Sequence, residues 1–219
     1  YIDLEHCNFS IETTSQLCVS ALQIGLLPFV RVPANTPEWI SRVLDAGAMG
    51  VIAPHIRSAE EAAAVVKYAK FPPYGERSSS GAMSHFSYKG IPAAKLYPLM
   101  NANTMVIVQF ESQAALDNAE SIIATEGVDI VLIGTNDLLA DLGIPGQYDH
   151  AKVNDAYQLT IDLCKKYGKW CGVGGLSSRS DLVEKYVKAG ARYVSSGTDL
   201  GFLISITAEK AKQIKSIVY

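Results

Sequence analysis

The stretch Met105–Leu138 constrains the fold more than any other part of the sequence; it reads MVIVQFESQAALDNAESIIATEGVDIVLIGTNDL. Two apolar, β-rich runs, Met105–Phe110 and Val128–Ile133, flank a segment whose apolar residues recur with the period of one helix. This pattern predicts a strand–helix–strand unit with two neighbouring parallel strands. Each strand is followed by a carboxylate, Glu111 after the first and Asp137 after the second.

The carboxyl ends of neighbouring parallel strands share one rim, where α/β proteins bind their ligands. We therefore expect Glu111 and Asp137 on that rim. Mg²⁺ and Mn²⁺ favour carboxylate oxygens and accept their remaining ligands from water and substrate. We interpret the two acids as a divalent-metal site; the alternative is that they only cap helices, since acids favour the first helical turn. Gly134–Asn136 places backbone N–H groups just before Asp137, where a turn can hold an anion.

Strands and helices alternate along the whole chain, and no shift in composition divides residues 1–219 into two domains. The predicted strands are Tyr1–His6 (the end of a strand), Leu27–Val32, Gly50–Pro54, Met105–Phe110, Val128–Ile133, Lys169–Val173 and Ala191–Ser195. A helix is predicted after each strand, the last over Asp199–Val218. Strict alternation favours an α/β fold, either a (β/α)₈ barrel or a doubly wound sheet.

No Gly-rich dinucleotide fingerprint follows any strand, which weakens the doubly wound alternative. A TIM (β/α)₈ barrel needs eight strands, and the pattern supplies seven. Because the chain opens inside a strand, we expect a barrel whose first βα unit, roughly 30 to 40 residues, is missing from this sequence.

Composition excludes several classes of protein. The net charge of −3 and the absence of a basic run argue against nucleic-acid binding. No apolar stretch is long enough to span a membrane, and no signal peptide opens the chain. The four cysteines are scattered, without a CxxC pair, so buried or spare thiols are favoured over disulfides or a metal cluster. We expect a soluble, cytoplasmic protein.

The first strand and its neighbour also carry polar residues. Strand alternation puts Asp3 and Glu5 on one side, with His6 near the strand end. A histidine held by a carboxylate at this rim is a candidate general base, although an Asp–His pair is more often structural. Arg31, between two valines, needs a partner: it forms a buried salt bridge with Asp3 or Glu5, clamps a carboxylate or enolate, or does both.

Two further regions hold candidate substrate contacts. Gln109, two residues before Glu111, points to the same side of its strand and is placed to orient a substrate or water. The Pro-, Gly- and Ser-rich segment Phe71–Lys89 is too long for a simple connection and is expected to be a functional loop. Arg77 and His85 in this loop are exposed candidates for substrate recognition; for His85 a non-functional role is favoured.

The motifs together resemble the HpcH/HpaI class II aldolases, which are metal-dependent pyruvate aldolases with macrophomate synthase among their relatives. The resemblance covers essentially the whole chain. It rests on DLEH at 3–6, VRVP at 30–33, PPYGERS at 72–78, QFES at 109–112 and GTNDLLADLG at 134–143. It implies a TIM barrel that assembles as a hexamer or trimer, with the last helix exchanged between subunits.

The resemblance also implies roles for individual residues. Its metal ligands fall on Glu111 and Asp137, and its catalytic histidine on His6, with Asp3 as the orienting acid. The residues that would contact the 2-oxo acid substrate are Arg31, Gln109, Asn136, Asp137 and Arg77. The implied cofactor is Mg²⁺, with Mn²⁺ or Co²⁺ as alternatives.

The implied reaction is reversible cleavage of a 4-hydroxy-2-oxo acid to pyruvate and an aldehyde through a metal-stabilised enolate. This mechanism needs no Schiff-base lysine, and none lies inside a predicted strand: Lys169 stands at a strand start, on the opposite rim. Ser78–Gly81 and Gly172–Leu176 depart from the family pattern near the mouth of the site, which leaves the substrate open. The alternatives are an oxaloacetate decarboxylase that forms the same enolate, and a non-catalytic barrel remnant.

Overall fold

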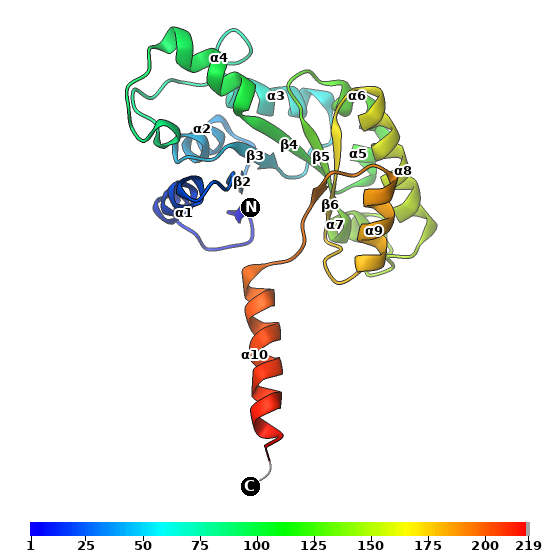
Figure 1. Ribbon diagram of the computed structural model, residues 1–219. Helices are drawn as coiled ribbons and strands as arrows, with labels where there is room; N and C mark the ends of the chain where they lie inside the picture. Colours follow the sequence, from blue (N-terminus) through cyan, green and yellow to red (C-terminus); the bar gives the residue numbers. More distant parts are fainter. Residues whose placement is uncertain (218–219) are drawn as a thin grey trace.

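The computed structural model describes residues 1–217 and contains one all-parallel, seven-stranded sheet (Figure 1). The strands pair in sequence order from β1 to β7. They span Ile2–Asp3 (β1), Phe29–Arg31 (β2), Gly50–Ala53 (β3), Met105–Phe110 (β4), Ile130–Gly134 (β5), Trp170–Gly174 (β6) and Tyr193–Val194 (β7). The sheet curls, with helices along its outer side, as in a TIM-like barrel (Figure 1).

Helices connect the successive strands. They span Ile11–Gln23 (α1), Pro37–Asp45 (α2), Ala59–Ala69 (α3), Ala93–Asn103 (α4), Gln113–Asp117 (α5), Ala119–Ala124 (α6), Thr135–Asp141 (α7), Ala151–Lys166 (α8), Ser180–Ala189 (α9) and Asp199–Lys215 (α10). The hydroxyls of Ser10, Thr36 and Ser58 accept the N–H of the third following residue and cap their helices. The long segment between α3 and α4 contains one 3₁₀ turn, Ser84–Phe86.

The prediction of seven parallel strands is confirmed, and the outer strands are shorter than predicted. β1 and β7 lie at the two edges of the described sheet, where each pairs on one side only. Val218, the predicted end of the last helix, lies outside the described residues. The expectation of a missing first βα unit stays a prediction. The four cysteines are free, and three of them are buried.

The prediction of one helix between β4 and β5 is wrong, because Asn118 divides that segment into α5 and α6. The side-chain amide of Asn118 donates to the carbonyl oxygens of Ala114 and Arg57. Asparagine side chains compete in this way with the backbone hydrogen bonds that would continue a helix. The contact with Arg57 also ties this helix pair to the loop after β3.

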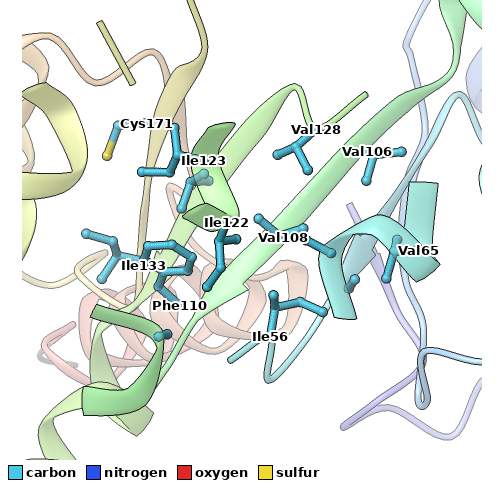
Figure 2. Packing of buried hydrophobic residues seen from close by; sticks show 14 of the residues in the cluster. Ile56, Val65, Val106, Val108, Phe110, Ile122, Ile123, Val128, Ile133 and Cys171 are labelled. Carbon is cyan, nitrogen blue, oxygen red and sulfur yellow. The ribbon is translucent and has the colours of Figure 1, made fainter. Parts of the chain in front are cut away.

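The main core lies between the sheet and its outer helices. Along β4, Val106, Val108 and Phe110 belong to this core, which also contains Ile122 and Ile123 of α6 (Figure 2). The alternate residues of the strands face the concave side, where a smaller apolar cluster lies: Ile52, Ile107, Ile130 and Leu132.

Strand alternation then determines which polar side chains enter the concave side. Gln109 and Glu111 share the inward parity of Ile107 on β4. Arg31 shares the parity of Phe29 on β2, and Asp3 pairs with Arg31 in the parallel register. The carboxyl ends of the strands therefore bring polar groups together above the inner apolar cluster.

The last helix, α10, extends away from the body of the protein (Figure 1). None of its residues is buried, although its sequence is rich in large apolar side chains. The large exposed apolar residues of α10 are Leu200, Phe202, Leu203, Ile204, Ile206 and Ile214. Among residues 1–217, no helix has both the length and the apolarity that crossing a membrane requires.

Candidate active site

Arg31 anchors one side of the candidate site. Its Nε and Nη2 donate to the two carboxylate oxygens of Asp3, at 2.9 and 2.6 Å. Its Nη1 lies 3.0 Å from Glu5 Oε2. Both salt bridges that the sequence offered as alternatives are thus present. Burial lowers the pKa of Arg31, but the hydrogen bonds and charges of its partners outweigh burial and raise it, so the guanidinium stays charged.

Glu111 anchors the other side and is 5% exposed. Gln109 Nε2 donates to its Oε1 at 2.9 Å, and the backbone N–H of His55 donates to its Oε2 at 2.9 Å. Burial raises the pKa of Glu111, and the charges of Asp137 and Glu5 raise it further, while His55 opposes them. A buried carboxylate among other acids is electrostatically unfavourable without a compensating cation.

Gly134, the last residue of β5, makes room for this carboxylate. A Cβ at position 134 would lie 2.7 Å from both Cγ and Oε1 of Glu111. Any side chain at that position would displace Glu111, so glycine is required by close approach rather than by backbone conformation. The chain then enters α7, which carries Asp137 in its first turn.

Asn136 and Asp137 lie exposed at the start of α7. Thr135 fixes this turn, because its hydroxyl donates to the carbonyl oxygen of Gly174 and lies 2.8 Å from the buried Tyr157 hydroxyl. A Cβ at Gly175 would approach the backbone nitrogen of Asn136 to 3.3 Å. Glycine there keeps the space beside that N–H open, as a substrate carboxylate would need.

The structure places His6 at the same rim but does not pair it with Asp3. The carboxylate of Asp3 is occupied by Arg31 and accepts the backbone N–H groups of Glu5 and His6. The His6 side chain is 62% exposed, and its Nε2 lies 3.7 Å from Glu5 Oε2. The prediction that Asp3 orients the His6 ring is therefore corrected. Both oxygens of Asp3 bind Arg31, and Glu5 is the carboxylate beside the His6 imidazole.

His55 is a site residue that the sequence did not reveal. It follows β3 after Pro54 and has a left-handed backbone, with φ of 57°. Its Nδ1 lies 2.9 Å from Glu111 Oε2 and its Nε2 lies 2.8 Å from Glu5 Oε1. The rule that singled out Glu111, a polar residue just after a strand, also applied to His55; its backbone turn toward the site carried no sequence signal.

The prediction that Arg77 is exposed is wrong. Its side chain is 0% exposed, its Nη2 lies 2.8 Å from Asp45 Oδ1, and its guanidinium packs on the Phe71 ring. Asp45 ends α2, just before β3, so this cluster lies at the amino ends of the strands. Within this chain, Arg77 is therefore remote from Glu111. Nε2 of His85, in the same loop, lies 3.0 Å from the carbonyl oxygen of Ala48.

The residues at the rim suit a divalent cation with few protein ligands. Glu111 and Asp137 interact electrostatically, and Glu111 Oε1 keeps a lone pair beyond its hydrogen bond from Gln109. The Oε1 atom of Gln109 is buried and has no hydrogen-bond partner among the described residues. Residues 1–217 contain no cluster of three or more His, Cys, Asp or Glu side chains arranged to hold a metal. Substrate and water would therefore supply most ligands.

The chain matches a known family along nearly all of its length. The profile of the family described as HpcH/HpaI aldolase/citrate lyase matches residues 1–205. The 4-hydroxy-4-methyl-2-oxoglutarate aldolase of Hapsidospora irregularis is 34% identical, over 99% of this chain and 82% of its own length. The 5-keto-4-deoxy-D-glucarate aldolase of Klebsiella pneumoniae is 35% identical, over 98% of this chain and 82% of its own.

A solved structure agrees with these matches. The crystal structure of an HpcH/HpaI aldolase from Desulfitobacterium hafniense superposes with a TM-score of 0.88 at 30% sequence identity. The superposition covers 99% of this chain and 83% of the aldolase chain.

The salt bridge between Asp3 and Arg31 makes stability depend on pH. Burial raises the pKa of Asp3, but the hydrogen bonds and charge of Arg31 outweigh burial and hold it below its usual value. A carboxylate with a lowered folded-state pKa stabilises the fold above its unfolded pKa, roughly 4. That contribution disappears as the pH falls through the folded-state pKa.

We expect Asp3→Asn to lower the free energy of unfolding at neutral pH by about 2 kcal/mol, because a charge-assisted hydrogen-bond pair is lost. The difference from wild type should begin to shrink as the pH falls below about 4, the unfolded-state pKa, and should vanish as the pH passes through the lowered folded-state pKa of Asp3. Urea denaturation over this pH range measures both quantities. A difference that stays constant down to low pH would show that the charge of Asp3 contributes nothing.

Proposed function

The chain belongs to the HpcH/HpaI aldolase/citrate lyase family, and we propose that it catalyses divalent-metal-dependent aldol cleavage of a 4-hydroxy-2-oxo acid to pyruvate and a carbonyl partner. The expectation of an enzyme is confirmed: the chain is a carbon–carbon lyase. Metal dependence and the substrate are the parts that we propose.

The observation that carries the proposal is the environment of Glu111. A buried carboxylate beside Asp137, with donors on both of its oxygens, is stabilised when a divalent cation neutralises the pair. Glu111 and Asp137 would hold the ion, with Mg²⁺ as the expected metal and Mn²⁺ or Co²⁺ as alternatives. When bound, the ion supplies the positive charge that stabilises an enolate at the 2-oxo group.

Arg31 supplies a second fixed positive charge. Its guanidinium is held on three nitrogen atoms by Asp3 and Glu5, so it needs no reorientation when negative charge develops on the substrate. The open N–H of Asn136 would receive the substrate carboxylate. The unpartnered Oε1 of Gln109 would accept a hydrogen bond from the substrate or from an ordered water.

His6 is the proposed general base. Its exposed imidazole stands at the rim beside Glu5, where it can take the proton of the 4-hydroxyl, directly or through a water, while the C3–C4 bond breaks. Glu5 would stabilise the imidazolium that results. The site needs no lysine nucleophile, because Arg31 and the metal provide the positive charge that a Schiff base would otherwise supply.

The relatives narrow the class of substrate. The names 4-hydroxy-4-methyl-2-oxoglutarate aldolase and 5-keto-4-deoxy-D-glucarate aldolase both describe oxo dicarboxylic acids. We therefore propose an oxo dicarboxylic acid for this chain. An assay that measures pyruvate, the carbonyl product and CO₂ together separates cleavage from decarboxylation of oxaloacetate.

We further propose that the protein acts as a homo-oligomer, a hexamer or trimer. α10 leaves all of its large apolar side chains exposed, and an exposed apolar surface of this kind is typical of a protein–protein interface. A second copy of the chain would bury them.

We expect Glu111→Ala and Asp137→Ala each to abolish Mg²⁺ and Mn²⁺ binding, since one of only two protein ligands is removed, and to lower turnover by a factor of roughly a thousand or more. Isothermal titration with the metal and a pyruvate-release assay measure the two effects. Glu126→Ala is the matched control, because Glu126 is an exposed acid just before β5, at the opposite end of the sheet. Metal binding unchanged in both active-site variants would contradict the metal assignment.

His6→Ala should slow aldol cleavage by a factor of roughly 100 to 10,000, the usual contribution of a general base. It should leave metal affinity unchanged, because His6 does not contact Glu111 or Asp137. Parallel measurements of turnover and Mg²⁺ affinity distinguish the two effects. An unchanged rate would remove His6 from the mechanism.

A further inference from the structure

His55 connects the two sides of the active site, and the proposed reaction gives it no role. Its ring nitrogens lie 2.8 Å from Glu5 Oε1 and 2.9 Å from Glu111 Oε2. Its backbone N–H also donates to Glu111 Oε2, at 2.9 Å. A single residue thus touches the same oxygen of the proposed metal ligand twice.

The segment that carries His55 is held on both sides. The carbonyl oxygen of Pro54 accepts a hydrogen bond from the Asn35 side chain at 2.7 Å. The carbonyl oxygen of Arg57 accepts one from the Asn118 side chain at 3.0 Å. These anchors come from the loop after β2 and from the junction of α5 and α6. The position of His55 is therefore set by neighbouring elements as well as by its own contacts.

The backbone of His55 is unusual for a residue with a side chain. A φ of 57° lies in the left-handed region, which residues other than glycine adopt uncommonly, although asparagine, aspartate and histidine are enriched there. Such conformations persist where surrounding contacts impose them, and they are common at functional sites. Here the conformation aims the N–H at Glu111 while the ring reaches Glu5.

A chain of contacts runs through His55 across the rim. Arg31 Nη1 meets Glu5 Oε2 at 3.0 Å, the other oxygen of Glu5 meets His55, and His55 meets Glu111. Without the imidazole, two carboxylates would face each other across the gap. Two neighbouring negative charges repel each other, and long acidic side chains are free to rotate apart.

We propose that His55 is a positioning residue for the metal ligand Glu111. It holds the Oε2 side of the carboxylate, as Gln109 holds Oε1, and it couples Glu111 to the Glu5–Arg31 side of the site. This inference rests on the proposed metal-dependent function. Groups that orient metal ligands in this way change metal affinity or activity by roughly 10- to 100-fold when removed.

The test is the His55→Gly variant. Glycine accepts the left-handed backbone and keeps the N–H to Glu111, so only the imidazole is lost. Titration with Mg²⁺ should give a dissociation constant roughly 10- to 100-fold above that of wild type. Free imidazole should restore part of that affinity, since the ring it replaces is half-exposed. Mg²⁺ is the probe because it prefers oxygen ligands, so it does not bind the imidazole that is added in the rescue experiment.

His55→Asn, which also tolerates this backbone, serves if the glycine variant does not fold. His85→Ala, a histidine at the other end of the sheet, should bind Mg²⁺ like wild type. Wild-type Mg²⁺ affinity in His55→Gly or His55→Asn would overturn the inference and leave the proposed function standing. If the His55 variants lost affinity for Mn²⁺ but not for Mg²⁺, the inference would also be overturned, because His55 would then be a direct metal ligand. Wild type that binds no Mg²⁺ would instead overturn the proposed function.

Discussion

In a parallel sheet all strands end at one rim, and residues two apart on a strand share a face. This constraint organises the protein. The even-numbered positions of β4 fill the core against the outer helices, while Ile107, Gln109 and Glu111 face the concave side. The same alternation on β2 turns Arg31 inward beside Asp3. A carboxylate and a guanidinium are thereby buried on neighbouring parts of one surface, where each requires compensation.

The compensation differs on the two sides of the site. The charge of Arg31 is paired with the carboxylates of Asp3 and Glu5, so that side is compensated within the chain and contributes stability. Glu111 has hydrogen-bond donors and the His55 ring beside it but forms no ion pair with a lysine or arginine among the described residues, and burial and nearby acids raise its pKa. Such an arrangement costs stability and is retained where function requires it. The difference explains why metal binding is proposed at Glu111 and Asp137 and not beside Asp3.

Much of this arrangement could be predicted from the sequence. The order of parallel strands predicts that Glu111 and Asp137 lie at one rim, and strand alternation predicts that Arg31 and Gln109 share the inner face. Pairings among long side chains could not be predicted, since several groups compete for each carboxylate: Arg31 pairs with both Asp3 and Glu5, and His6 lies only 3.7 Å from Glu5. The predicted exposure of Arg77 was wrong because the composition of a loop does not indicate which end of the sheet the loop packs against. His55 could not be predicted as a site residue, because nothing in the sequence indicates that its backbone adopts a left-handed conformation and turns toward Glu111.

The central claim is that Glu111 and Asp137 together hold the divalent ion that binds the 2-oxo acid. The most direct measurement is anomalous diffraction from crystals of the protein soaked with Mn²⁺ and oxalate, a stable mimic of the enolate of pyruvate. We predict one strong peak at the carboxyl ends of β4 and β5, contacted by oxygens of Glu111, Asp137 and oxalate. Oxalate bound at the rim without a metal peak, or a peak away from both carboxylates, would contradict the claim.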